Sequence, residues 1–240
     1  MKKFLFIILL SFTFSQYFGG NLSLMGQFPQ GEFKEQGVPW SIGGDISGMY
    51  NINDYLAFGI NAGGVQYGKT SRQIPFSYFV STIYITEETT NSLGYGNVFT
   101  RITPFQGPVQ PYLEGFVGLK NLSTKTTLFN QDCTDDPATD HDDCEIASGT
   151  NLTDTAFSYG AGGGLSVIIT NFVDDEGESN GELSFFLGMK YLWGNEADYL
   201  KEGDITFSDP AEGPVETFFN PSTSKTDIMQ FNIGVQFKAK

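Results

Sequence analysis

Apolar and polar residues alternate along much of this chain, most clearly near its C-terminus. Between residues 227 and 237 apolar side chains occupy every second position, and amides and glycine occupy the positions between them. The apolar set is Met229, Phe231, Ile233, Val235 and Phe237. Successive strand side chains point to opposite faces, so this pattern predicts a strand with one apolar and one polar face. A soluble sandwich turns its polar face to water, whereas a membrane barrel turns its apolar face to lipid.

The same alternation recurs in eight segments. They span residues 19–28, 40–50, 55–67, 93–105, 112–129, 157–169, 183–193 and 227–237. Another β-rich run, from Tyr78 to Thr86, either extends a strand pair or forms an ordered loop. If this run instead crosses the membrane and pairs with a partner strand, the barrel has ten strands.

The connectors between these segments alternate in length. Long ones cover 29–39, 68–92, 130–155 and 201–226, and shorter ones cover 51–54, 106–111 and 171–182. Short turns on one side and long loops on the other are typical of outer-membrane barrels. The patterning therefore predicts an all-β fold, an eight-stranded antiparallel up-and-down transmembrane β-barrel.

The N-terminus has the layout of a secretory signal peptide. Met1-Lys2-Lys3 is basic, and the apolar run from Phe4 to Leu10 is too short to cross a bilayer. We expect a signal peptide at residues 1–16, removed on export, and one barrel domain at residues 17–240. This predicts an exported protein of the bacterial outer membrane.

The excess of acidic residues excludes one class of binding partner. Removing Lys2 and Lys3 leaves 11 of the 13 basic residues against 28 acidic ones, a formal charge of −17. Such acidity argues against nucleic acid, whose phosphates it would repel.

A few charges lie inside the predicted strands, all on the face opposite the apolar one. They are Asp45, Arg101, Glu114, Lys120 and Lys190. The interior of an eight-stranded barrel is just wide enough for side chains, so we expect these five to pair in the lumen. Phe99, Phe116 and Phe186 would fill the space around them.

Several stretches carry a family resemblance. They are Tyr112–Gly118, Ser158–Leu165 and the terminal Gly234–Phe237, together with the signal peptide. With these the chain resembles the small outer-membrane β-barrel family typified by OmpA and OmpX. The resemblance implies a last strand read by the barrel-assembly machinery, although here the final aromatic, Phe237, lies three residues before the end. It also implies contact with outer-membrane lipid and lipopolysaccharide.

One acidic loop holds both cysteines. Because Cys133 and Cys144 lie close together in an exported chain, we expect a disulfide between them. The carboxylates around them could attract Ca²⁺, but their spacing is not that of an EF-hand, so we expect a solvated acidic loop. His141 is the only histidine and no nucleophile is marked by its spacing, so we expect no catalysis, no metal and no cofactor.

The expected function is non-catalytic: a structural or surface-interaction role, through long acidic extracellular loops, with an unidentified extracellular partner. One alternative is a narrow channel, or a passage with lateral exit, for small hydrophobic solutes. A second alternative is a secreted soluble β-barrel that binds a ligand.

Overall fold

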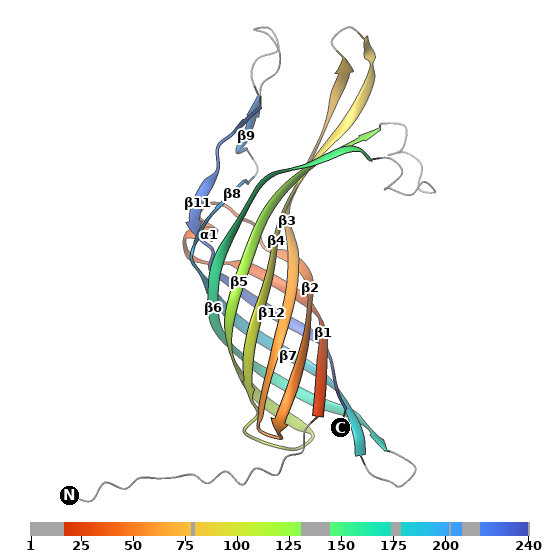
Figure 1. Cartoon of the computed structure of the whole chain (residues 1–240), viewed down its shortest axis with the longest axis vertical. Helices are drawn as coiled ribbons and strands as arrows, with labels where there is room; N and C mark the ends of the chain where they lie inside the picture. The colour runs from red at the N-terminus through yellow and green to blue at the C-terminus, as the bar shows by residue number, and fades with distance from the viewer. Residues whose placement is uncertain are drawn as a thin grey trace, which may run out of the picture.

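The chain forms a closed barrel of eight antiparallel strands (Figure 1). The computed structural model describes residues 17–77, 80–130, 145–173, 179–201, 203–207 and 217–239. Each barrel strand pairs with its neighbours in the chain, and β1 also pairs with β12, which closes the ring. The strands are β1 (Tyr17–Pro29), β2 (Ser41–Asn53), β3 (Leu56–Ser77), β4 (Val80–Ile102), β5 (Val109–Asn130), β6 (Glu145–Val173), β7 (Ser179–Gly194) and β12 (Ile228–Ala239). The predicted eight-stranded barrel is confirmed.

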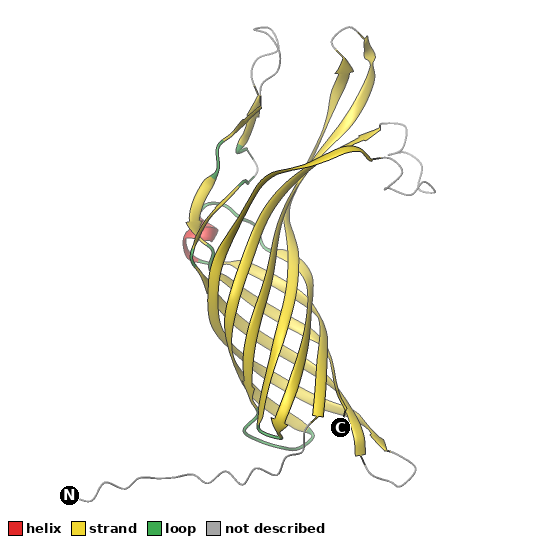
Figure 2. Ribbon diagram, viewed as in Figure 1, coloured by secondary structure: helices red, strands yellow, loops and turns green. Residues whose placement is uncertain are grey.

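The remaining elements are short and lie at one end of the barrel (Figure 2). They are the helix α1 (Gly31–Glu35) and the strands β8 (Glu196–Tyr199), β9 (Ile205–Phe207), β10 (Thr217–Phe219) and β11 (Ser222–Lys225). β8 pairs with β11, and β9 pairs with β10. No helix in the described ranges is long and apolar enough to cross a bilayer.

The alternation of side chains sorts them between the lumen and the outer wall. In β12, Phe231, Ile233 and Val235 are each nearly half exposed, while Gln230 and Gln236 are buried. The other barrel strands repeat this arrangement, so polar side chains fill the interior and apolar ones form a continuous outer belt. Because water-exposed surfaces do not present such a belt, it must face lipid.

Aromatic side chains border the belt at both ends, as they do in membrane barrels. At the end with the short turns, Phe18 packs on Tyr50 and Phe172 on Phe237, with ring centroids 5.3 and 5.9 Å apart. At the opposite end, Tyr159 stacks on Trp193 at 5.4 Å. The two rings of aromatics mark the membrane interfaces.

The connectors differ between the two ends of the barrel, as predicted. At the end where β1 starts and β12 finishes, Asn53 accepts hydrogen bonds from the backbone N–H groups of Tyr55 and Leu56, both at 2.9 Å, and so fixes a tight turn. The long connections lie at the other end, which by the usual arrangement of such barrels faces the cell exterior.

The expected length of the upper loops was wrong in three places. Residues 68–92 continue β3 and β4 as a paired hairpin, β6 already begins at Glu145, and the 201–226 connector contains β9, β10 and β11. The run Tyr78–Thr86 therefore lies at the top of the β3–β4 hairpin, apart from residues 78 and 79, which lie outside the described residues. It adds no strands to the barrel, so the ten-stranded alternative is wrong.

Candidate functional site

The centre of the lumen holds a buried ion pair between β2 and β7. Lys190 Nζ lies 2.9 Å from Asp45 Oδ2, and both side chains are 7% exposed. The same carboxylate oxygen accepts hydrogen bonds from Asn61, at 2.6 Å, and from the hydroxyl of Tyr95. The ammonium group also lies 5.3 Å from the ring centre of Phe116. Several partners thus offset the cost of burying the two charges.

A second buried pair lies nearer the periplasmic end. Arg101 donates from Nε to Glu114 Oε1 at 2.7 Å and from Nη1 to Gln236 Oε1 at 2.8 Å. Its guanidinium group lies 4.3 Å from the ring centre of Tyr112. Arg101 therefore links β4, β5 and β12 across the lumen.

The structure does not place Lys120 in the same arrangement. Its side chain is fully buried, and Nζ donates to the backbone carbonyls of Leu192, at 2.9 Å, and Thr226, at 2.5 Å. The expectation that all five charges pair with one another is therefore wrong for Lys120. It ties the end of β7 to the residues just before β12.

Sequence reasoning missed a third lumen pair, at the periplasmic mouth. Lys238 lies 3.2 Å from Glu182 and donates to Gln110 at 2.9 Å. The alternation of side chains along each strand could have placed Lys238 and Glu182 in the lumen. However, the predicted strand 227–237 ended one residue before Lys238, and the predicted strand 183–193 began one residue after Glu182.

Little space is left inside the barrel. A cavity of about 30 Å³ lies beside the two central ion pairs, and one of about 10 Å³ lies between Arg101 and Lys238. A single water needs roughly 10–15 Å³ by this measure. As predicted, Phe99, Phe116 and Phe186 fill the lumen, each about 4% exposed.

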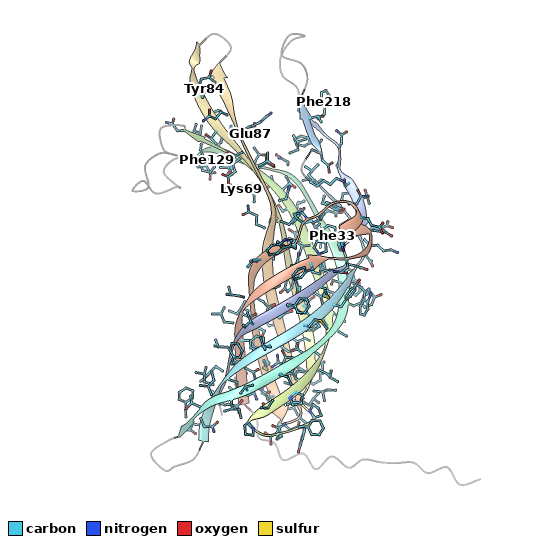
Figure 3. All side chains as sticks on the ribbon, turned by 180° about the vertical axis from the view of Figure 1, so that it is seen from behind. Phe33, Lys69, Tyr84, Glu87, Phe129 and Phe218 are labelled. Atoms are coloured by element: carbon cyan, nitrogen blue, oxygen red, sulfur yellow. The ribbon has the colours of Figure 1, made fainter. Side chains whose placement is uncertain are left out.

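An aromatic cluster caps the extracellular end of the lumen. We call it the cap, and it consists of Phe33, Tyr67, Tyr199 and Leu200. Phe33 lies edge-on to Tyr199 and Tyr67, with ring centroids 5.0 and 6.3 Å apart, and all four side chains are buried. The Tyr67 hydroxyl donates to the Leu200 carbonyl at 3.4 Å. Burial raises the pKa of Tyr199, so this side chain stays neutral within the cap. Figure 3 shows Phe33 at the rim of the barrel.

Replacing Phe33 by alanine should open this cap. A buried Phe→Ala change costs about 3–5 kcal/mol, and the cap can loosen without unfolding the barrel below it. We expect trypsin to cleave the folded variant after the exposed Lys34 much faster than it cleaves the wild type. The control is Phe218→Ala, because Phe218 is 49% exposed on β10. Equal cleavage of both variants would show that Phe33 does not hold the cap closed.

Four strands continue beyond the cap as a paired sheet, which we call the extension. It comprises residues 66–77 of β3, 80–93 of β4, 122–130 of β5 and 145–157 of β6. Figure 1 shows it rising well above the barrel. Hydroxyl, amide and charged groups hold it together: Thr89 with Thr126 at 2.8 Å and Thr124 with Asn91 at 2.7 Å, among others.

Two ion pairs of the extension lie on opposite faces of the same two strands. Arg72 donates to Glu87 Oε2 from Nε at 2.8 Å and from Nη2 at 2.5 Å, on the face that continues the lumen. Lys69 lies 2.8 Å from Glu88, the next residue of β4, whose side chain points to the opposite face. Figure 3 labels Lys69 and Glu87 above the barrel rim.

A large hollow lies on the outer wall. It has a volume of about 760 Å³ and is apolar, with Phe18, Tyr50 and Phe58 at one side and Gly48 and Gly115 among its floor residues. This groove lies within the lipid-facing belt and borders the aromatics at the periplasmic interface.

Some predicted features lie outside the described residues. These are the signal peptide at residues 1–16, the pair Cys133 and Cys144, His141 and most of the acidic loop around them. Within the part of the chain that the structure describes, no three His, Cys, Asp or Glu side chains gather closely enough to hold a metal ion.

Several solved structures of outer-membrane proteins show a limited similarity to the chain. Neisserial surface protein A is 15% identical, with a TM-score of 0.41 over 94% of this chain and 96% of that one. The attachment invasion locus protein Ail of Yersinia pestis, solved in complex with the heparin analogue sucrose octasulfate, is 12% identical, with a TM-score of 0.33 over 93% and 97% of the two chains. The outer membrane protease OmpT from Escherichia coli is 10% identical, with a TM-score of 0.34 over 96% and 98%.

No protein-family model and no curated protein sequence matches the chain. Its own structure nevertheless has the closed ring of strands, the lipid-facing belt between two aromatic girdles and the contrast between short turns and long loops. Together these features make the chain a transmembrane β-barrel of the bacterial outer-membrane type.

Proposed function

We propose that the protein is a non-catalytic, non-conducting barrel that carries a surface-interaction platform outside the outer membrane. The observation that carries this proposal is the extension, in which four paired strands continue beyond the apolar belt. Hydrogen bonds and ion pairs stabilise its described part. Such a rigid sheet above the membrane suits contact with a partner outside the cell better than it suits passage through the barrel.

The filled lumen supports the non-conducting part of the proposal. Ion pairs occupy the middle of the lumen and its periplasmic mouth, and the cap covers its extracellular end. The two lumen cavities described above have room for about one to three water molecules each. A hydrated ion has no continuous path of that size.

The proposal is tested by conductance and adhesion together. The purified barrel in planar bilayers should give no discrete single-channel currents. Cells that display the wild type should adhere to a partner cell or surface, and cells that display a variant with residues 68–91 replaced by a short turn should adhere less. Steady channel openings would contradict the non-conducting role, and unchanged adhesion by the shortened variant would contradict the role of the extension.

A further inference from the structure

A cleft with both polar and apolar lining opens on the extracellular side of the cap. Its volume is about 90 Å³. One wall is the inner face of the extension, with Thr70, Arg72, Glu87, Thr89 and Asn91, and the other wall is formed by Lys201, Gly203 and Ile205. We call this hollow the cleft. Figure 1 shows the two walls as separate arms above the barrel.

The polar groups of the inner wall are held in place by their neighbours. Two hydrogen bonds from Arg72 end on Glu87 Oε2, which leaves the second carboxylate oxygen to accept from a ligand. The hydroxyl of Thr89 is held by Thr126 at 2.8 Å, and the Asn91 amide oxygen accepts from Thr124 at 2.7 Å. Groups that are already oriented lose little conformational entropy when a ligand binds.

The lining favours a neutral ligand that is both donor and acceptor. The charge of Arg72 offsets that of Glu87, and the other groups of this wall are hydroxyls and an amide. Lys201 of the opposite wall is also positively charged, but its ammonium group is already engaged, donating to Gln36 Oε1 at 2.9 Å. The formal charge of the chain, −15, would also repel a small anion. Sugar hydroxyls both donate and accept, which matches carboxylate, amide, guanidinium and threonine groups placed side by side.

The size of the cleft limits the ligand to about one ring. A volume of 90 Å³ corresponds to roughly six to nine water positions. The Tyr67–Leu200 hydrogen bond and the Phe33 contacts separate the cleft from the lumen, so a ligand enters from outside. We propose that the cleft binds one neutral sugar residue of a cell-surface glycan. This inference rests on the proposed surface-interaction function and names a ligand for the same extension.

Adjacent glutamates on opposite faces of β4 provide a matched test. Glu87 lies in the cleft, and Glu88 pairs with Lys69 on the other face. Glu87→Gln and Glu88→Gln make the same chemical change at neighbouring positions. The probes are glucose, galactose, mannose, N-acetylglucosamine and lactose, titrated into the detergent-folded barrel and followed by calorimetry or by NMR shifts.

We expect at least one of these neutral sugars to bind saturably, with a Kd on the order of 1 mM. Glu87→Gln should weaken this binding by about tenfold, because a hydrogen bond to a charged carboxylate is replaced by a weaker one to a neutral amide, and Glu88→Gln should leave it within about twofold. No saturable binding of any of the five sugars, equal loss in both variants, or a preference for glucuronate or sulfated sugars over the neutral ones would overturn the assignment.

Two further arms complete the experiment. Thr89→Val, with Thr90→Val on the opposite face as its control, repeats the comparison if Glu87→Gln does not fold. Titration in nanodiscs with and without lipopolysaccharide distinguishes the two sources of the sugar. If lipopolysaccharide competes with the free sugar, the natural ligand is in the protein's own membrane. If lipopolysaccharide does not compete, the natural ligand is on another cell. A sealed barrel that adheres but binds no sugar would refute this inference alone, whereas single-channel currents would refute the proposed function.

Discussion

Replacing Asp45 by alanine should lower the free energy of unfolding of the barrel by about 3–5 kcal/mol. The change leaves the ammonium group of Lys190 buried, with only the Tyr95 hydroxyl, 3.3 Å away, and aromatic faces around it. Urea unfolding of the barrel in detergent or lipid vesicles, followed by the different gel migration of boiled and unboiled samples, measures this loss.

The control for this prediction removes both charges. In Asp45→Ala/Lys190→Met the aliphatic part of the lysine is retained and no unpaired ammonium group is left. The double variant should therefore recover much of the stability lost in Asp45→Ala. If the double variant is less stable than the single one by the full cost of Lys190→Met alone, the two residues are not energetically coupled.

Replacing Ile233 by arginine should impair insertion of the barrel by about 2–4 kcal/mol if the residue lies near the bilayer midplane. Ile233 is 47% exposed on β12 and lies opposite Leu187 of β7 within the apolar belt. An arginine at this position would have to enter hydrocarbon. Folding into lipid vesicles under a urea titration measures the cost.

Phe219→Arg is the matched control for this change. Phe219 is 45% exposed, almost the same fraction as Ile233, but it lies on β10, outside the barrel wall. There an arginine remains in water, so the variant should fold like the wild type. Equal tolerance of the two arginines would mean that the belt does not face lipid.

Local pattern was enough to predict the faces of the barrel strands. The apolar set of β12 does face outward, and Phe99 and Arg101 of β4 do face the lumen, because the period of two in the sequence follows directly from strand geometry. The alternation of connector lengths likewise predicted which end carries the short turns. Charged residues such as Asp45 and Lys190 could be assigned to the lumen because they alternate with apolar residues along their strands.

For the extension the same pattern left two alternatives open at Tyr78–Thr86, an extended strand pair or an ordered loop, and the structure confirms the first. Residues 68–73 and 86–92 contain only polar, charged and glycine residues, so no apolar alternation marks them. Their pairing follows that of the barrel strands after a β-bulge between Gln66 and Gly68, with Lys69 opposite Thr90 and Arg72 opposite Glu87. The helix that carries Phe33 has only five residues, too few for a helical period to be seen.

The sequence by itself determined the fold class, the lipid-facing and lumen-facing residues and the side of the membrane that carries the loops, because each depends on local alternation and connector length. Only the tertiary structure decided which charges meet. Asp45 and Lys190 are 145 residues apart on strands that are not neighbours in the ring, and Lys120 bonds to carbonyls that the closure of the barrel brings to it. The cap and the cleft were decided in the same way, because both form where segments distant in the chain fold over the end of the barrel.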